Sequence, residues 1–110
     1  MKVENTKAQM RKGVLEYCIL GILAQGELYP PDIISSLKDA KLIVVEGTLY
    51  PLLTRLKDAG LLTYRWEESR SGPPRKYYKL TTLGEKFLNE LDQTWDELAK
   101  AVTKTTRRKA

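Results

Sequence analysis

The chain has 110 residues, the size of one domain around one hydrophobic core. Its 19 basic and 14 acidic residues give a formal net charge of +5, and this excess favours a polyanionic partner. With one cysteine and no histidine, the chain has no internal disulfide, no cysteine-only zinc site and no imidazole to act as a general base. We therefore expect neither an enzyme nor a metal or other cofactor.

The apolar residues do not form a membrane-spanning segment. The longest apolar run, Tyr17 to Ala24, is much shorter than the roughly 20 residues that a membrane helix needs. Residues 1–12 lack the apolar core of a signal peptide, so we expect a cytoplasmic protein with no membrane partner. Cys18 lies inside the apolar run and is interpreted as a buried small side chain without a function of its own.

Two helices are predicted in the first part of the chain. Residues 1–12 are polar, and apolar residues recur at helical spacing from Gly13 to a break at Gln25-Gly26. The first helix is therefore expected to begin at Gly13. Tyr29-Pro30-Pro31-Asp32 is typical of the start of a second helix, because proline lacks only a donor that the first turn leaves free.

A third helix is predicted over residues 46–60, after a loop around residues 38–45, with Gly60 as its C-terminal cap. One face is apolar and consists of Leu49, Leu52, Leu53 and Leu56. The opposite face carries hydrogen-bonding groups of modest length: Thr48, Tyr50, Pro51, Thr54 and Arg55. A helix with one firmly buried face and one polar face is suited to enter the major groove of DNA.

A β-hairpin is predicted after residue 61, where the apolar period changes to two. Leu62, Tyr64 and Trp66 lie on one side of its first strand, and we expect Trp66 to pack the hairpin onto the core. Residues 69–74 interrupt the pattern before a second strand that ends at residues 76–80. The charges between Glu68 and Leu80 are all basic: Arg70, Arg75, Lys76 and Lys79. Such a tip is suited to lie near phosphates.

A long last helix is predicted from Thr82-Leu83-Gly84-Glu85, read as a capping box, to about Thr103. Its apolar residues Leu88, Leu91, Trp95, Leu98 and Val102 alternate spacings of three and four. A domain this small has little surface left to cover that seam, so a partner helix is expected to cover it. Residues 104–110 form a basic tail, interpreted as a solubilising end.

The order of these elements predicts a mainly α fold with a small β-hairpin: a winged helix-turn-helix plus a long C-terminal dimerisation helix. Residues 1–81 are the expected DNA-binding domain, and residues 82–110 the dimerisation helix and tail. The candidate DNA contacts are Thr48, Tyr50, Pro51, Thr54 and Arg55 on the third helix and Arg70, Ser71, Gly72, Arg75, Lys76 and Tyr77 on the hairpin.

Three segments of the chain resemble the PadR-like family of transcriptional regulators. They are residues 12–23, the segment Gly47-Thr48-Leu49-Tyr50-Pro51-Leu52-Leu53-Thr54-Arg55-Leu56, and Pro74-Arg75-Lys76-Tyr77-Tyr78-Lys79-Leu80-Thr81 followed by Gly84. The resemblance is to the compact subfamily with one C-terminal helix, and it implies a homodimeric repressor released by a small ligand. It places Thr48, Tyr50 and Pro51 on the recognition motif and Arg75, Lys76 and Tyr77 on the wing motif. The chain departs from the family at Pro30-Pro31, where a glycine and an aromatic residue are usual, so a DNA contact there is not carried over.

The expected homodimer has two-fold symmetry, with Leu15, Leu88, Leu91, Trp95, Leu98 and Val102 as interface candidates. Trp95, beside Leu91, has two interpretations. Its ring either fills the dimer core or offers a flat face to a small aromatic effector, as in some family members. Both interpretations remain open.

The predicted function is a ligand-responsive repressor that binds a (pseudo)palindromic operator in double-stranded DNA as a homodimer. The alternative is a winged helix used for protein–protein interaction, since fold alone does not fix function. Association with a membrane surface through the basic tail is disfavoured by the acidic residues of the last helix, namely Glu85, Glu90, Asp92, Asp96 and Glu97. The operator sequence and the effector depend on docking angle and cavity shape, which the sequence does not give.

Overall fold

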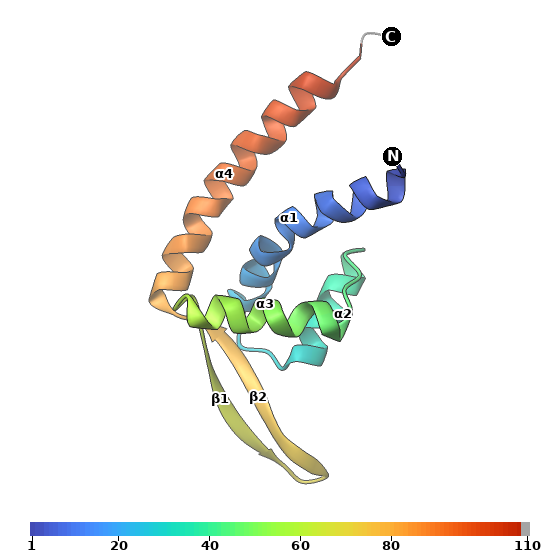
Figure 1. Cartoon of the computed structure of the whole chain (residues 1–110). Helices are drawn as coiled ribbons and strands as arrows, with labels where there is room; N and C mark the ends of the chain where they lie inside the picture. The colour runs from blue at the N-terminus through green and yellow to red at the C-terminus, as the bar shows by residue number, and fades with distance from the viewer. Residues whose placement is uncertain (109–110) are drawn as a thin grey trace.

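The computed structural model describes residues 1–108, which form four helices and one two-stranded antiparallel hairpin (Figure 1). The elements are α1 (Val3–Leu23), α2 (Pro30–Asp39), α3 (Glu46–Asp58), β1 (Leu62–Ser69), β2 (Gly72–Leu80) and α4 (Thr82–Thr106). This confirms the predicted winged helix-turn-helix followed by a long helix. Within the described residues, no helix is both long and apolar enough to cross a membrane.

The core lies where α1, α2 and α3 meet the base of the hairpin. The fully buried side chains are Ile19, Leu20, Ile33, Leu37, Leu49 and Leu53. The helix ends follow the predicted chemistry. Pro30 lies at the first position of α2, and Gly60, at φ +82°, follows Ala59, the C-cap residue of α3. The apolar faces therefore converge as the helical spacing predicted.

The predicted start of α1 at Gly13 is wrong, because the helix begins ten residues earlier, at Val3. Residues 3–12 contain neither proline nor glycine, and Glu4 and Lys7 form an ion pair of 3.6 Å within the first turns. All of these residues are exposed, so this part of the helix packs on nothing in the chain and needs no apolar face. Apolar periodicity detects helices that pack on a core and misses a polar helix end in solvent.

The hairpin turn is shorter than predicted. Residues 70 and 71 separate the strands, and β2 already begins at Gly72, so Pro73 and Pro74 belong to the strand. The pairing shifts register between Glu67 and Ser69, opposite the two prolines. Proline is tolerated at such an irregularity in an edge strand, because no ladder donor is needed there.

The capping residue of α4 is Thr81 and not the predicted Thr82. The Thr81 hydroxyl accepts a hydrogen bond from the Gly84 amide at 3.0 Å and donates one to the Gly60 carbonyl oxygen at 2.6 Å. The helix continues to Thr106, three residues beyond the predicted end. Lys109 and Ala110 of the predicted basic tail lie outside the described residues.

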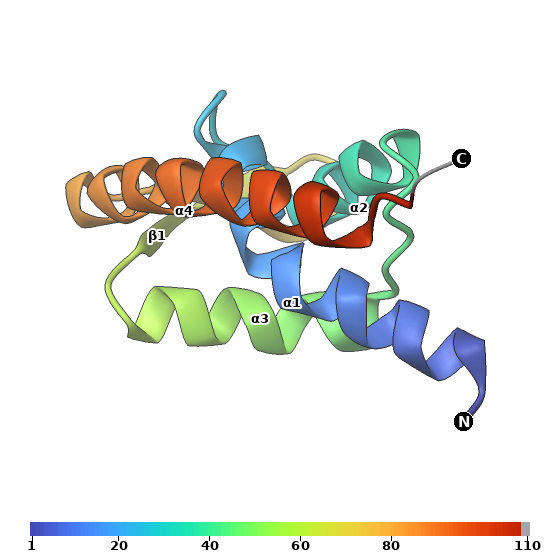
Figure 2. The same cartoon turned by 90° about the horizontal axis from the view of Figure 1, so that it is seen from above.

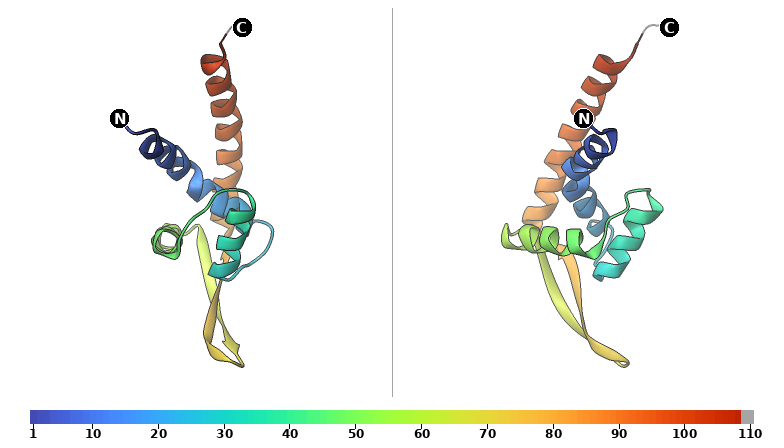
Figure 3. Two further views of the ribbon diagram at one scale, coloured as in Figure 1. Left: turned by 90° about the vertical axis from the view of Figure 1, so that its right-hand side faces the viewer. Right: turned by 45° about the vertical axis from the view of Figure 1, so that its right-hand side comes forward.

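The hairpin and α4 extend from opposite sides of the three-helix core (Figure 3). The molecule measures 60 × 31 × 22 Å. Seen from above, α1 crosses between α4 and α3 (Figure 2), and the free ends of α1 and α4 diverge. The C-terminal half of α4 therefore has no neighbouring element among the described residues.

Candidate nucleic-acid interface

Helix α3 is fixed to the core by one face and exposed on the other. Leu49, Leu53 and Leu56 are buried, at 0%, 0% and 3% exposure. The residues predicted to contact DNA on this helix, Thr48, Tyr50, Pro51, Thr54 and Arg55, are all exposed. Pro51 lies inside the helix and lacks the N–H that would bond the Gly47 carbonyl, but both residues lie on the solvent side.

The exposed residues of α3 divide between two sides. Tyr50 and Thr54 face the hairpin across a groove described below. Arg55 lies on the α1 side, where its guanidinium forms an ion pair of 3.1 Å with Glu16. Arg55 stays 73% exposed in this pair, so a DNA phosphate would compete with Glu16 for it.

A groove of about 300 Å³ separates α3 from the hairpin. We call it the α3–hairpin groove. Its lining combines aromatic, proline and basic side chains from the start of α2, from α3 and from both strands: Tyr29, Pro30, Tyr50, Thr54, Trp66, Pro74, Arg75, Lys76 and Tyr78. Four predicted DNA-contact residues therefore border one groove, two from α3 and two from β2.

The basic side chains of β2 are held against aromatic rings. The Arg75 guanidinium lies 5.0 Å from the ring centre of Tyr29. Lys76 Nζ lies 4.1 Å from the ring centre of Tyr64 and 5.1 Å from that of Trp66. Such contacts attract a cation to the ring face and reduce its freedom. Arg70, Ser71 and Gly72 are exposed at the tip.

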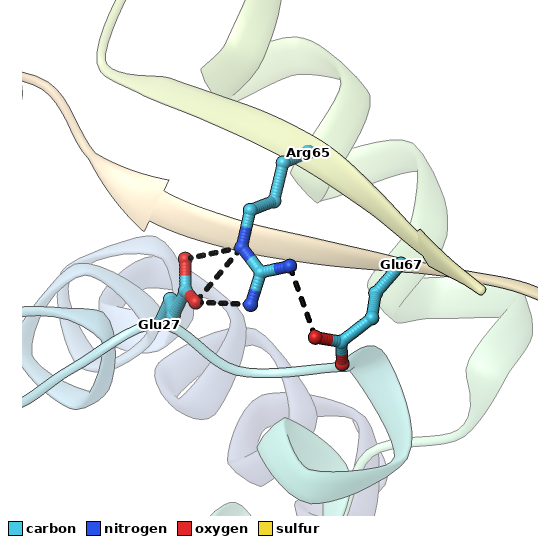
Figure 4. A network of polar contacts seen from close by, with 3 residues as sticks. All are labelled: Glu27, Arg65 and Glu67. Carbon is cyan, nitrogen blue, oxygen red and sulfur yellow. Dashed lines mark hydrogen bonds and ion pairs between the residues drawn. The ribbon is translucent and has the colours of Figure 1, made fainter. Parts of the chain in front are cut away.

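Two contacts that sequence reasoning missed anchor the hairpin to the α1–α2 loop. Arg65 of β1 donates from Nε to Glu27 Oε1 at 2.9 Å and from Nη1 to Glu67 Oε1 at 3.3 Å (Figure 4). The hydrogen bonds from Arg65 lower the pKa of Glu27, and those same bonds raise the pKa of Arg65. Leu28 also exchanges two backbone hydrogen bonds with Tyr78 of β2, at 3.0 and 2.9 Å. The charge of Arg65 is thus satisfied by carboxylates and serves to position the hairpin.

Two aromatic residues of the hairpin differ from their predicted places. Trp66 is 61% exposed, so the prediction that it packs onto the core is wrong. At Trp66 the hairpin extends beyond the helices that cover its base. The alternation of side chains along a strand predicts which face a residue lies on, but not how far along the strand that face is covered. Tyr77, a predicted DNA contact, is half-buried, with its ring centre 5.9 Å from that of Tyr29 and the Arg65 guanidinium 5.0 Å from it.

The candidate interface residues on α1 and α4 separate into two groups. Leu15 and Leu88 are buried inside the single chain, at 8% and 9% exposure, because α1 and α4 pack there on the core. In the single chain they therefore have little surface left for a partner. Leu91 is half-buried, whereas Trp95, Leu98 and Val102 are exposed.

Trp95 lies beside Tyr17 of α1, with ring centres 6.4 Å apart. The Tyr17 hydroxyl donates a hydrogen bond to Asp92 Oδ1 at 2.6 Å. This bond raises the pKa of Tyr17 to about 12, since it stabilises the protonated phenol. These contacts join α1 to α4.

A helix with a buried and an exposed face, seated on a three-helix core beside a basic antiparallel hairpin, is the architecture of a winged-helix DNA-binding protein. Residues 19–90 match the model of the transcriptional regulator PadR-like family, which is more than half of the chain. The chain belongs to the PadR-like family of transcriptional regulators. It is a family of DNA-binding regulators and not of enzymes.

Solved structures of this family share the fold over nearly the whole chain. A PadR-like transcription factor from Bacteroides fragilis is 61% identical, with a TM-score of 0.78 over 93% of this chain and 99% of that one. A PadR-like transcriptional regulator from Bacillus cereus is 37% identical, with a TM-score of 0.81 over 92% of this chain and 99% of that one. The chain is also 36% identical to the negative transcriptional regulator PadR of Bacillus subtilis, over 70% of this chain and 44% of that protein, so it spans less than half of that relative.

Proposed function

We propose that the protein is a ligand-responsive repressor that binds a (pseudo)palindromic operator in double-stranded DNA as a homodimer. The observation that carries this proposal is the α3–hairpin groove, in which an exposed helix face and two basic side chains border one hollow. In this arrangement α3 enters the major groove and the hairpin lies along the sugar-phosphate backbone. Residues 1–81 bind DNA, and residues 82–110 form the dimerisation segment.

The two elements have different roles in the proposal. Thr48, Tyr50, Pro51 and Thr54 of α3 offer hydroxyl and apolar groups to base edges, which determine sequence preference. On the hairpin, Arg70, Arg75 and Lys76 meet phosphates, and Ser71, Gly72 and Tyr77 support them. Each phosphate that a cation neutralises releases counterions and adds about 0.9 to the slope of log K against log salt concentration. The hairpin therefore sets affinity and its dependence on salt.

The homodimer is supported by the exposed apolar stripe of α4. Trp95, Leu98 and Val102 are 42%, 50% and 47% exposed. Complete burial of a large apolar side chain is worth about 1.5–3 kcal/mol, so covering these half-exposed residues adds about 1 kcal/mol each. In a two-fold symmetric dimer, each protomer contributes the same stripe to the interface. A second copy of α4 is the partner of matching length and apolar pattern.

The DNA-binding part is tested by fluorescence anisotropy of two labelled duplexes, one from upstream of the gene and one of random sequence, across a salt series. We expect tighter binding to the upstream duplex and a steep salt slope. Arg70→Gln should weaken binding and lower the slope by about 0.9, because one phosphate contact is lost. Lys104→Gln removes the same charge from the far end of α4 and is the matched control. Equal, weak binding to both duplexes would favour the protein-interaction alternative instead.

The effector part is tested with Trp66→Phe, which leaves Trp95 as the one tryptophan of the chain. A flat aromatic compound that stacks on Trp95 should quench its emission and weaken DNA binding. If such a compound still binds, by calorimetry, when Trp95→Ala is added, Trp95 only packs the dimer core. Unchanged DNA affinity at saturating effector would contradict ligand-responsive repression.

A further inference from the structure

Trp66 is a large exposed side chain to which the proposed function assigns no role. It lies on β1, directly opposite Lys76 of β2 in the strand register, and it is 61% exposed. Trp66 is one of the residues that line the α3–hairpin groove. A second hollow, of about 590 Å³, is lined by Trp66, Glu68, Pro73 and Pro74. Trp66 thus borders both hollows, and its contacts with Tyr64 and Lys76 leave more than half of its surface exposed.

The surroundings of Trp66 pair an apolar surface with a cation at fixed distance. Lys76 Nζ lies 5.1 Å from the Trp66 ring centre and 4.1 Å from that of Tyr64. Tyr64 meets Trp66 edge to face, with ring centres 6.1 Å apart. Lysine is among the side chains that lose most rotamer freedom when ordered, and here the rings restrict it before any ligand arrives. An ordered ammonium beside an exposed indole is therefore present in the unbound protein.

The charges nearby indicate on which side an anion can bind. Glu67 is held by Arg65, at 3.3 Å, on the far face of the strand. Glu68 borders the second hollow and repels an anion there. Lys76 lies on the same face of the hairpin as Trp66, whereas Arg75 lies on the face of Glu67 and reaches the groove beside Tyr29. The lining of the groove contains no acidic side chain. The groove side of Trp66 is therefore the side that attracts phosphate.

We propose that Trp66 contacts DNA, with its ring packed against a deoxyribose while Lys76 bonds the adjacent phosphate of the same strand. This inference rests on the proposed function. Sugar and phosphate alternate along the backbone, so an apolar face next to a cation matches one nucleotide unit. Stacking on a base would require unstacking the duplex, at a few kcal/mol per step, whereas the sugar is exposed in every duplex. The contact adds affinity that does not depend on sequence.

A direct test uses Trp95→Phe, which leaves Trp66 as the one tryptophan, with a random-sequence duplex as the probe. We expect the Trp66 emission to change and its quenching by iodide to fall, with the same midpoint as the anisotropy of the labelled duplex. Trp66→Phe, which reports from Trp95 on the distant α4, is the matched control. Anisotropy that shows binding without any change at Trp66 overturns this inference and leaves the proposed function intact. Absence of binding in the anisotropy of the wild-type protein overturns both.

A second test separates an apolar contact from an ionic one. Trp66→Ala should weaken DNA binding about five- to tenfold with an unchanged salt slope, because no phosphate contact is lost. Lys76→Gln should lower the slope by about 0.9. The double variant should lose less than the product of the two single effects, since the ring orders the ammonium. Unchanged affinity in Trp66→Ala, with thermal unfolding also unchanged, would contradict the contact.

Discussion

Gly84 lies where the first turn of α4 crosses the residue before β1. A Cβ atom at this position would lie 2.1 Å from the Leu61 carbonyl oxygen, which is backbone and cannot rotate away. The Thr81 cap and its hydrogen bond to Gly60 fix α4 at the same place. The angle at which α4 leaves the core thus depends on the absence of a side chain at Gly84.

Gly84→Ala is expected to lower the free energy of unfolding by about 1–3 kcal/mol, the range found when extra atoms are forced into a packed site. Urea unfolding followed by circular dichroism measures the change. Gly13→Ala is the matched control, because nothing lies within 4 Å of a Cβ there, and it should raise stability by about 0.5–1 kcal/mol through helix propensity. Equal effects of the two substitutions would show that Gly84 is not restricted by packing.

At the level of elements, the orientation of the hairpin depends on the contacts at its base. Arg65 and Glu27 join β1 to the α1–α2 loop, and Leu28 joins the same loop to β2. Both strands are therefore held by one loop, while the tip extends free toward solvent (Figure 1). A change at the base would move the phosphate-binding residues together.

The ion pair at this base predicts a pH dependence. Because the pKa of Glu27 is lowered below its ordinary value of 4.5, the ionised form is favoured in the folded protein. Its contribution to stability is present above about pH 4.5 and is lost as pH falls through the lower, folded-state value. NMR titration of the Glu27 carboxyl should give a depressed pKa that returns toward the ordinary value in Arg65→Met. The pKa should stay depressed in Arg70→Gln, the control at the hairpin tip.

Helix α3 carries a second ion pair, between Arg55 and Glu16 of α1, and it predicts a gain of affinity. Glu16→Gln releases the guanidinium, which is already 73% exposed, for a DNA phosphate. We expect tighter binding and a salt slope steeper by up to about 0.9, measured by anisotropy. Arg55→Gln should reverse both changes when combined with Glu16→Gln. Weaker binding in Glu16→Gln alone would mean that the pair orients α3.

For the whole molecule, the decisive feature is that α4 extends beyond the core that supports it. Its first turns are anchored by Leu88 and by the Tyr17–Asp92 hydrogen bond of 2.6 Å. Beyond Trp95 the apolar stripe faces solvent in the single chain. An amphipathic helix that leaves its apolar face exposed is stabilised when a partner covers that face.

Leu98→Glu is therefore expected to convert a dimer into a monomer, since it places a charge in the centre of the stripe. Light scattering should give half of the wild-type mass, and DNA affinity should fall because two half-sites are no longer bound together. Asn89→Glu adds the same charge to an exposed position of α4 away from the stripe and should remain dimeric. Wild-type protein that is monomeric at micromolar concentration would contradict the dimer.

How far the sequence predicts the site differs between its residues. Tyr50 and Thr54 were predicted on the exposed face of α3 and lie there, because helical spacing and buried leucines determine that face locally. The excess of basic residues on the hairpin was likewise evident from the sequence alone. Arg65 with Glu27 and Arg55 with Glu16 are separated by 38 and 39 positions and pair only after the elements have packed. Charge composition alone does not distinguish a cation paired within the protein from one available to DNA.

The sequence by itself determined the order and type of the elements, the winged-helix architecture and the family. These follow from periods of two and 3.6 residues, prolines at helix starts, Gly60 after α3 and short motifs, all of which act between neighbours in the chain. Only the tertiary structure decided that Trp66 is exposed, that Leu15 and Leu88 belong to the core of the single chain, and that Thr81 caps α4. The first two depend on where one element stops covering another, and the Thr81 cap is accompanied by a hydrogen bond to Gly60, 21 positions away. Local patterns cannot specify that boundary, because the covering residues come from distant parts of the chain.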